Sequence, residues 1–385
     1  MPTAPTVAVI GGGQLARMLA EPATALGIPL RLLAEAPGVS AAQVIADHEV
    51  GDYRNLTTLR LVTDGCAVVT FDHEHVPTEH LHALEADGIA VRPGPEALVH
   101  AQDKGVMRAA LARLGVPCPR NVVVETPEEV AAFGFPCVLK TTRGGYDGKG
   151  VWFVTSEEDT LAAFEQAAAT GVRILAEELV DFRRELSALV ARSPSGQVAA
   201  WPVVASEQRD GICREVIAPA PDLAPELAVA AEQIAMTIAG ALGVVGVLAV
   251  ELFETTDGRV LVNELAMRPH NTGHWTQDGA VTSQFENHLR AVLDLPLGAP
   301  DARARWSVMV NILGPDSVAG DRLYDGYPHA LARDPRIRVH LYGKELRPGR
   351  KVGHVNAYGD DLEDCLARAR HAAAWFAGEL GDESE

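Results

Sequence analysis

The stretch GVLAVELFETTDGRVLVNELA, residues 246–266, contains two apolar runs that are separated by Asp257-Gly258. Asp-Gly is a residue pair that two-residue β-hairpin turns favour. Glu251 lies six residues before this pair and Glu264 six residues after it, so the two acids face each other across the predicted hairpin. Directly opposed like charges destabilise a sheet. The pattern therefore predicts an acid pair that needs a nearby cation.

Two interpretations of this acid pair follow from the residues. Both glutamates could face solvent, or they could form a Mg²⁺ site, because Mg²⁺ prefers carboxylate and phosphate oxygens. The apolar neighbours indicate that the acids are half buried, which favours the metal site. A longer turn would shift the pairing by one residue. In the predicted register Asn263 points to the other face and is not assigned to the metal.

Long strand-like segments precede the hairpin and predict an antiparallel sheet in a C-terminal domain, residues 183–385. These segments are 184–193, 199–208 and 211–220, and helices are expected at 225–242 and 361–378. Closely spaced apolar runs upstream predict a small α+β domain at 104–182. Its expected strands are 122–126, 136–142, 150–156 and 173–180, with a helix at 157–170.

The small domain contains Lys140 and the glycine-rich loop TTRGGYDGKG, residues 141–150. This loop lacks the Gly-Lys-Ser/Thr ending of a Walker phosphate loop. Its glycines permit positive φ angles and a close approach of the backbone to a ligand. The loop is therefore predicted to close over a triphosphate, but phosphate binding alone does not explain Tyr146 and Asp147 at its tip.

The first part of the chain, residues 1–103, alternates strand-like runs with helical segments, which predicts a parallel α/β domain. The expected strands are 6–10, 29–35, 43–47, 66–72 and 88–94. GGGQLA, residues 11–16, also fits a dinucleotide fingerprint with Glu35 as the ribose acid. A lone fingerprint is weak, and a tight strand-to-helix turn explains the same residues. The helix start is kept as an anion site that contributes to substrate binding.

Composition limits the classes of function. The chain has 385 residues and a net charge of −19, which argues against binding a nucleic acid. Cations nevertheless gather at 140–149, 268 and 344–351, as a small anionic ligand requires. The sequence has no apolar run of the ~18 residues that a membrane span needs. Five scattered cysteines without a CxxC spacing predict reduced thiols in the cytoplasm.

Four motifs in order, GGGQLARML, TTRGGYDGKG, NELAMRPHNTGHWT and YGKELRPGRKVGHV, resemble the N5-carboxyaminoimidazole ribonucleotide synthetases of the ATP-grasp superfamily. The resemblance extends from residue 6 to about residue 358. It implies a Rossmann-like N-terminal domain, a small lid and a larger antiparallel domain. It also implies a cytoplasmic homodimer that uses ATP, Mg²⁺ (or Mn²⁺) and bicarbonate. ATP and bicarbonate would give carboxyphosphate and ADP, and carboxyphosphate, or CO₂ released from it, would carboxylate the exocyclic amine of 5-aminoimidazole ribonucleotide.

The resemblance also implies roles for individual residues. Glu177 and the Val180 backbone would contact adenine, Glu185 the ribose hydroxyls, and Glu251 and Glu264 the metal. Ala266 replaces an Asn that binds metal in many relatives, so fewer protein ligands are expected. The other ATP-binding residues would be Lys104, Lys140, Gly145 and Gly148. The implied catalytic residues are Arg268, His270, Asn271, Lys351 and Glu74. The implied residues for the ribonucleotide are Gln14, Tyr146, Asp147, Lys149, Lys344 and Arg350.

Alternative functions remain at this point. Another ribonucleotide-using ATP-grasp enzyme, such as a formate-using transformylase or a glycinamide ligase, would share most motifs, but the Tyr146-Asp147 tip and GHWT argue against it. A nicotinamide-dependent dehydrogenase could use GGGQLA, and a non-catalytic nucleotide-binding protein would be expected to lack the acid pair. The histidines of FDHEHVP, residues 71–77, suggest zinc, but no second ligand cluster has metal spacing. In this motif Asp72 replaces a commoner Glu.

Overall fold

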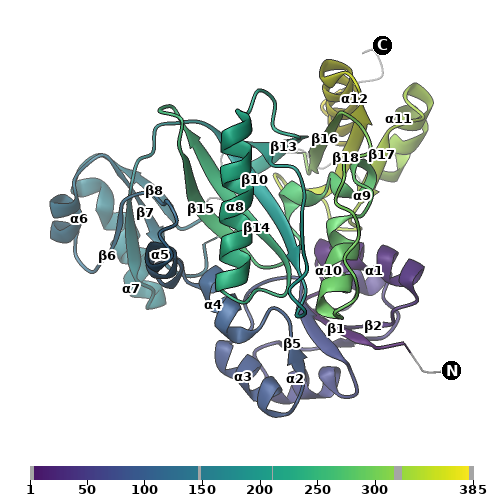
Figure 1. The fold of residues 1–385 in the computed structure, drawn as a ribbon, viewed down its shortest axis with the longest axis horizontal. Coiled ribbons are helices and arrows are strands. Elements are labelled where there is room, and N and C mark those ends of the chain that lie inside the picture. The colour runs from purple at the N-terminus through teal and green to yellow at the C-terminus, as the bar shows by residue number, and fades with distance from the viewer. Residues whose placement is uncertain (1–3, 146–148, 210, 316–322, 381–385) are drawn as a thin grey trace.

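The computed structural model describes the whole chain except residues 1–3, 146–148, 210, 316–322 and 381–385. The predicted site residues Tyr146, Asp147 and Gly148 therefore lie outside the described residues. In the described part of the chain, no helix is long and apolar enough to cross a membrane. Figure 1 shows three groups of elements: an N-terminal sheet with helices, a small lid to one side, and a large central sheet.

The N-terminal sheet is parallel, as predicted, with the order β3-β2-β1-β4-β5. Its strands are β1 (Val7–Ile10), β2 (Leu30–Ala34), β3 (His48–Val50), β4 (Val68–Phe71) and β5 (Ala90–Val91), and its helices are α1 (Gln14–Leu26), α2 (Leu56–Thr63), α3 (Thr78–Ala86) and α4 (Pro95–Gln102). The strand predicted at 43–47 is wrong. A 3₁₀ turn, Ala41–Gln43, and a loop occupy this segment, and the backbone N–H groups of Val44 and Ile45 both donate to Ala41 O.

The lid is a four-stranded antiparallel sheet with the order β6-β9-β7-β8. Its elements are α5 (Lys104–Arg113), β6 (Asn121–Val124), α6 (Pro127–Phe133), β7 (Cys137–Thr141), β8 (Val151–Val154), α7 (Leu161–Thr170) and β9 (Ile174–Glu178). Helix α5 begins at Lys104 because the Asp103 side chain caps it, accepting a hydrogen bond from Val106 N at 3.1 Å. The cap places Lys104 in the first turn, facing the large sheet.

The central sheet has nine strands and is antiparallel, with the order β15-β14-β10-β12-β13-β16-β18-β17 and β11 beside β10. The strands are β10 (Phe182–Arg192), β11 (Val198–Ala200), β12 (Val204–Arg209), β13 (Ile212–Ala218), β14 (Gly246–Thr255), β15 (Val260–Ala266), β16 (Trp306–Leu313), β17 (Arg338–Leu341) and β18 (Lys351–Gly359). The sequence predicted its first half. Strands β16 to β18, which extend the same sheet, were not predicted.

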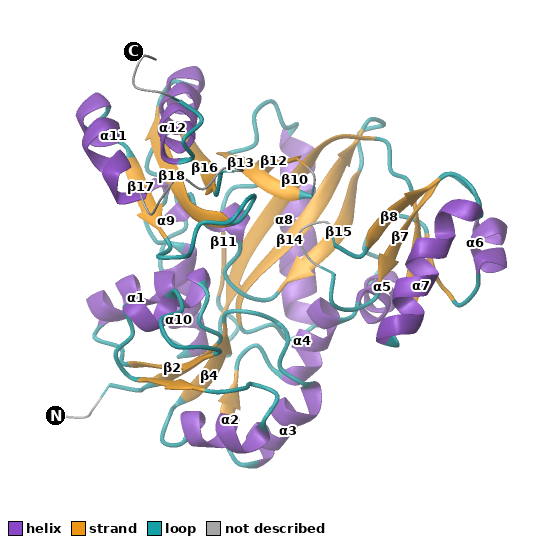
Figure 2. Cartoon of the chain, turned by 180° about the vertical axis from the view of Figure 1, so that it is seen from behind, coloured by secondary structure: helices purple, strands orange, loops and turns teal. Residues whose placement is uncertain are grey.

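Helices cover this sheet and join it to the N-terminal domain. Helix α8 (Pro225–Ala241) lies across β10 and β14, and α12 (Leu362–Phe376) packs on β16 and β18. Helix α10 (Gln284–Val292) packs against both α1 and β14, so Phe285 and Leu289 complete the core of the N-terminal sheet. The remaining helices are α9 (Thr276–Gly279) and α11 (Tyr327–Arg333). In Figure 2 the lid lies at one edge of the molecule, and α11 and α12 lie at the opposite edge.

The boundaries at 1–103, 104–182 and 183–385 stay a prediction. The largest apolar cluster runs across the first of these boundaries, because Leu98 and Met107 pack in the same cluster as Leu248 and Val262. By contrast, the lid has a separate small core that includes Leu139 and Ala176. The lid sheet thus has a core of its own, whereas α5 packs in the largest cluster through Met107.

Candidate active site

The turn of the β14-β15 hairpin is longer than predicted. Thr255 N donates to Arg259 O at 2.9 Å, which leaves a three-residue loop, 256–258. Gly258 has φ of 81°, the left-handed conformation that such a loop needs at its last position. The predicted two-residue turn is therefore wrong. Beside the loop, Glu254 pairs with Val260, one residue out of the expected register.

A β-bulge then restores the predicted pairing of the acids. The register shifts between Glu251 and Leu252, and Asn263 is the extra residue on β15. Beyond the bulge Glu251 lies directly opposite Glu264, so the predicted pairing is confirmed although its reason was incomplete. The assignment of Asn263 to the other face needs correction. Its Oδ1 accepts a hydrogen bond from Lys140 Nζ at 3.0 Å, which places the amide on the lid side of the hairpin.

The two acids have different electrostatic surroundings. Burial, followed by repulsion from Glu264 and Glu185, raises the pKa of Glu251 to about 7. Burial acts in the same direction on Glu264, but Lys104 outweighs it and holds the pKa of Glu264 below its ordinary value. Lys104 Nζ lies 2.6 Å from Glu264 Oε1. The pair thus has one lysine as a counter-ion and one acid that remains poorly compensated.

Lys140 is held by a buried ion-pair network. Its Nζ lies 2.7 Å from Glu177 Oε2, and Arg108 Nε lies 2.5 Å from Glu177 Oε1. Burial alone would raise the pKa of Glu177, but Arg108 and Lys140 lower it below the ordinary value. Glu177 is 2% exposed and both of its oxygens are engaged. The side chain of Glu177 thus holds Lys140 in place, and the expected adenine contact of Glu177 stays a prediction.

Val180 lies in a pocket of about 260 Å³ between the end of β9 and the hairpin loop. The lining combines Leu179 and Leu261 with polar and charged residues, among them Glu178, Asp181 and Arg259. Glu185 follows on β10, and burial raises its pKa to about 7, with Lys140 acting in the opposite direction. The structure therefore places Val180 at a pocket, and Glu185 within electrostatic reach of the lysine.

The base of the glycine-rich loop is tightly folded. A Cβ atom on Gly145 would lie 2.8 Å from Lys149 O, and one on Gly150 would lie 2.5 Å from Thr141 Oγ1. Gly150 also has φ of 71°, which disfavours any other residue. Arg143 Nε donates to Asp103 Oδ2 at 2.9 Å, so the start of the loop is attached to the cap of α5. These contacts bring the loop close to Lys104.

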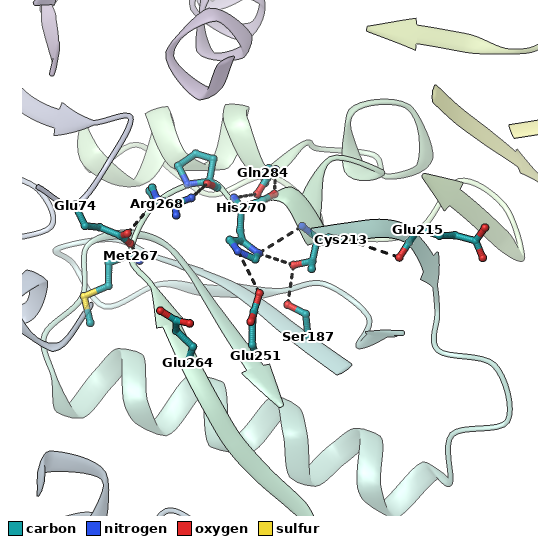
Figure 3. Close-up of polar contacts among 12 residues, drawn as sticks. Glu74, Ser187, Cys213, Glu215, Glu251, Glu264, Met267, Arg268, His270 and Gln284 are labelled. Atoms are coloured by element: carbon teal, nitrogen blue, oxygen red, sulfur yellow. Dashed lines mark hydrogen bonds and ion pairs between the residues drawn. The ribbon is translucent and has the colours of Figure 1, made fainter. Parts of the chain in front are cut away.

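Arg268 and Glu74 meet across two domains, as Figure 3 shows. Arg268 Nε lies 3.2 Å from Glu74 Oε2, and Met267 N donates to Glu74 Oε1 at 2.8 Å. Burial opposes the charge of Arg268, but Glu74 more than offsets this and raises its pKa. The guanidinium is thus fully charged, and its orientation is fixed from the N-terminal domain.

His270 is neutral and directed at the acid pair. Burial, with the charges of Arg268 and Lys351, lowers its pKa well below the ordinary value. Its Nδ1 lies 2.9 Å from Thr272 Oγ1 and accepts a hydrogen bond from Thr272 N at 3.4 Å, whereas Nε2 lies 3.4 Å from Glu251 Oε1. The next residue, Asn271, has both amide atoms buried without a hydrogen-bond partner among the described residues. His270 and Asn271 therefore offer neutral polar atoms next to the carboxylates.

Gln14 and Lys344 come together from opposite ends of the sequence. Lys344 Nζ donates to Gln14 Oε1, and Gln14 is the first residue of helix α1. The charge of Lys344 thus lies beside the first turn of α1, where it can attract an anion. Arg350 instead donates to Glu345 O at 3.3 Å. The charge of Lys351 contributes to the lowered pKa of His270 and opposes the rise in the pKa of Glu251, so it acts on the carboxylate centre.

Comparison with known proteins accounts for all three regions. Residues 4–102 match the ribonucleotide synthetase preATP-grasp domain, 109–285 the ATP-grasp domain, and 307–368 the phosphoribosylaminoimidazole carboxylase C-terminal domain. An N5-carboxyaminoimidazole ribonucleotide synthase of Mycobacterium tuberculosis is 55% identical over 97% of this chain and 88% of that protein. The chain belongs to the N5-carboxyaminoimidazole ribonucleotide synthase family.

Solved structures of the synthase family share the fold. The ADP complex of an N5-carboxyaminoimidazole ribonucleotide synthetase has a TM-score of 0.88 at 36% identity and covers 99% of this chain and 100% of that one. The Aspergillus clavatus synthase, solved with ADP and 5-aminoimidazole ribonucleotide, has a TM-score of 0.88 at 31% identity with the same coverage. The expected ATP-grasp fold is confirmed.

The family assignment agrees with the local geometry at GGGQLA, which does not favour a dinucleotide. Glu35 Oε2 accepts a hydrogen bond from Gly12 N at 2.9 Å, and Asp72 Oδ1 accepts one from Ala16 N at 2.8 Å. Two carboxylates thus occupy the amides that a pyrophosphate would need. The dehydrogenase alternative is corrected on this ground. The same contacts give Asp72 a structural role at the start of α1.

Two residues that the sequence reasoning missed support the synthase site. Arg108 holds Glu177 from inside helix α5. Gln284 is fully buried and holds the His270 backbone at both ends, accepting from His270 N and donating to His270 O, each at 2.8 Å. The sequence signal for both residues was a polar side chain at a position that the helix pattern would bury, because a buried polar group needs a hydrogen-bond partner. Neither partner could be identified from spacing alone.

Proposed function

We propose that this chain uses ATP and bicarbonate to carboxylate the exocyclic amine of 5-aminoimidazole ribonucleotide, forming N5-carboxyaminoimidazole ribonucleotide, ADP and phosphate. The observation that carries the proposal is the convergence of three groups on one site. Lys104 and Lys140 come from the lid side, Glu251 and Glu264 from the hairpin, and Arg268 is held by Glu74 from the N-terminal domain. Family membership supplies the reaction.

Glu251 and Glu264 would hold Mg²⁺ or Mn²⁺. The residues fit such an ion because the two carboxylates face each other in register and the pKa of Glu251 is raised to about 7. A divalent cation would offset the repulsion between the two acids and lower this pKa. Among the described residues there is no group of three or more His, Cys, Asp and Glu side chains placed to hold a metal. Phosphate and water oxygens would complete the shell. The ion, when bound, would neutralise charge on the transferring phosphoryl group.

ATP would place its base in the pocket beside Val180, with Glu185 near the ribose. Lys140 would reach the phosphates, since Glu177 and Asn263 fix its ammonium group between the lid and the hairpin. Gly145, Gly148 and Lys149 would belong to the loop that closes over the phosphates. Phosphoryl transfer depends on positioning and charge neutralisation more than on covalent help from the protein.

Bicarbonate would bind at Arg268, with His270 and Asn271 as neutral partners. A bicarbonate oxygen attacks the γ-phosphorus, the bond to the β-phosphate oxygen breaks, and carboxyphosphate and ADP form. The amine nitrogen then attacks the carboxyl carbon, the carbon–oxygen bond to phosphate breaks, and the amine loses a proton. Arg268 can hold the oxyanion of bicarbonate and then that of carboxyphosphate, because its guanidinium remains charged and Glu74 fixes its plane. Lys351 would stabilise charge at the same centre.

The ribonucleotide would bind with its 5′-phosphate at Gln14, Lys344 and Arg350. On a chain with net charge −19, this concentration of cations is best explained by an anionic ligand. Tyr146 and Asp147 would face the aminoimidazole from the loop tip. We further propose that the protein acts as a cytoplasmic homodimer; its family and its five free cysteines support this. Sedimentation velocity tests the dimer.

The function is tested by phosphate release from ATP in the presence of bicarbonate. The rate is expected to rise on addition of 5-aminoimidazole ribonucleotide, and ¹⁴C-bicarbonate should enter the product in equal amount. Glycinamide ribonucleotide with formate serves as the competing substrate set. Stimulation by that set but not by 5-aminoimidazole ribonucleotide would overturn the proposal.

A further inference from the structure

Arg108 has an unusual set of contacts for a residue inside a helix. It lies in α5, is 3% exposed, and donates from all three guanidinium nitrogens. Nε donates to Glu177 Oε1 at 2.5 Å, and the two terminal nitrogens donate to the carbonyl oxygens of Val262 and Asn263, each at 2.8 Å. One guanidinium therefore joins a strand of the lid to the hairpin of the central sheet.

These contacts end on groups that hold the phosphate lysine and the metal acid. Glu177 lies 2.7 Å from Lys140 Nζ, and Lys140 donates to the side chain of Asn263 at 3.0 Å. Arg108 binds the backbone of the same Asn263, so Arg108, Glu177, Lys140 and Asn263 form a closed ring. Asn263 is also the bulge residue that brings Glu264 opposite Glu251.

The geometry requires arginine. A buried charge is costly unless its donors are satisfied, and a planar fork with several donors can serve one carboxylate and two carbonyls at once. Lysine is a point charge on a flexible chain and could reach only part of this set. Burial opposes the charge of Arg108, yet Glu177 keeps its pKa above the ordinary value, so the side chain stays charged.

We propose that Arg108 is a positioning residue for phosphoryl transfer: through Glu177 and the bulge at Asn263 it fixes Lys140 relative to Glu264. This inference rests on the proposed function, because it assumes that Lys140 meets the phosphates and Glu264 the metal. Arg108 acts through its partners and touches neither substrate. If Arg108 only stabilised the fold, the effects of replacing Arg108 and Lys140 on ADP binding and catalysis would be independent of each other.

A double-mutant cycle separates the two roles. We would prepare R108M, K140M and R108M/K140M, and measure the Kd of ADP with Mg²⁺ by calorimetry together with kcat and KM for both substrates. R108M is expected to weaken ADP binding and to lower kcat/KM for ATP by about 10- to 100-fold, as is usual when a supporting residue is lost. KM for the ribonucleotide should stay unchanged. In the K140M background the same substitution should cost less than about threefold.

The matched control is R370M. Arg370 makes a two-pronged ion pair with Glu215, at 2.7 and 2.9 Å, between α12 and β13. R370M should lower the melting temperature without changing ADP binding. If R108M does not fold, R108K replaces it in the experiment. R108K keeps the charge but loses part of the planar fork, so it should fold and show an intermediate loss of ADP binding and of kcat/KM for ATP. Additive effects of R108M and K140M, or kinetics of R108K equal to those of R370M, would overturn the proposal. Absence of turnover in the parent protein would instead count against the proposed function, since the ADP measurement does not need turnover.

Discussion

Lys104 Nζ lies 2.6 Å from Oε1 of Glu264, and Glu264 lies directly across the hairpin from Glu251. The ammonium group of Lys104 thus partly neutralises an acid pair whose charge a bound divalent cation would also neutralise. Lys104 comes from the first turn of α5, whereas Glu251 and Glu264 come from β14 and β15, the two strands of the central sheet on the lid side. Binding of ATP with its metal ion would draw Lys104 toward the phosphates and give Glu264 a new partner.

Replacement of Glu264 tests the metal assignment. E264Q is expected to lower kcat by at least about 100-fold, because it removes a metal ligand and leaves Lys104 without its counter-ion. Circular dichroism and the melting temperature should stay close to those of the parent protein. The control is E207Q, since Glu207 is an exposed acid on β12 of the same sheet. A rate for E264Q within threefold of the E207Q rate would remove the metal assignment.

The raised pKa values of Glu251 and Glu185, both about 7, predict proton release on ligand binding. Because the free protein binds protons as pH falls through 7 and the metal needs ionised carboxylates, affinity for ADP with Mg²⁺ should fall by up to about tenfold per pH unit below 7. Calorimetry at pH 7 in phosphate and in Tris should give different enthalpies. In E251Q the difference between the buffers should shrink; equal proton release in E251Q and the parent protein would contradict this.

His288 predicts loss of stability in acid. Burial lowers its pKa to about 3, its Nε2 lies 2.7 Å from Thr70 Oγ1, and Val247 N donates to Nδ1 at 3.1 Å. The folded pKa lies below the unfolded value of about 6.5, so this contribution to stability is present above pH 6.5 and is lost as pH falls toward 3. The expected slope is about 1.4 kcal/mol per pH unit for this one group.

Urea unfolding at several pH values measures this contribution. H288Q should be less stable than the parent protein at pH 7.5, because it disturbs the junction of the N-terminal and central sheets. Between pH 6.5 and 5 its stability should also fall less steeply. His80, a partly exposed histidine whose ring contacts Arg54 O, provides the control H80Q. Parallel pH profiles for H288Q and H80Q would contradict the assignment.

The pairing of Lys344 with Gln14 predicts selective loss of ribonucleotide binding. K344M should raise KM for 5-aminoimidazole ribonucleotide by about tenfold or more, the size expected for a charged hydrogen bond to phosphate, and leave KM for ATP unchanged. R347M is the matched control in the same segment, because Arg347 is exposed and forms an ion pair with Glu345, two positions away. An equal rise in both KM values for K344M would indicate a general distortion of the site.

The hairpin shows how far sequence reasoning extended into the site. The acids were paired correctly, yet the turn was one residue longer than predicted and a bulge at Asn263 compensated for it. Turn length and bulges depend on the hydrogen bonds that the backbone makes with neighbouring strands, and the residue pattern of one hairpin does not contain them. The position of Asn263 was therefore wrong while the position of Glu264 was right.

The sequence by itself determined the chemistry available: strands alternating with helices, a glycine-rich loop beside a lysine, an acid pair, and cations concentrated on an acidic chain. These features depend on local order and residue type, which spacing reveals. Only the tertiary structure decided the partners. Glu177 holds Lys140, Arg108 joins the lid to the hairpin, and Lys344 meets Gln14, 330 positions away along the chain. Such contacts form because a charged group that folding buries needs a partner of opposite charge or a hydrogen bond. Which residues lie close enough to serve as partners is set by the packing of whole sheets.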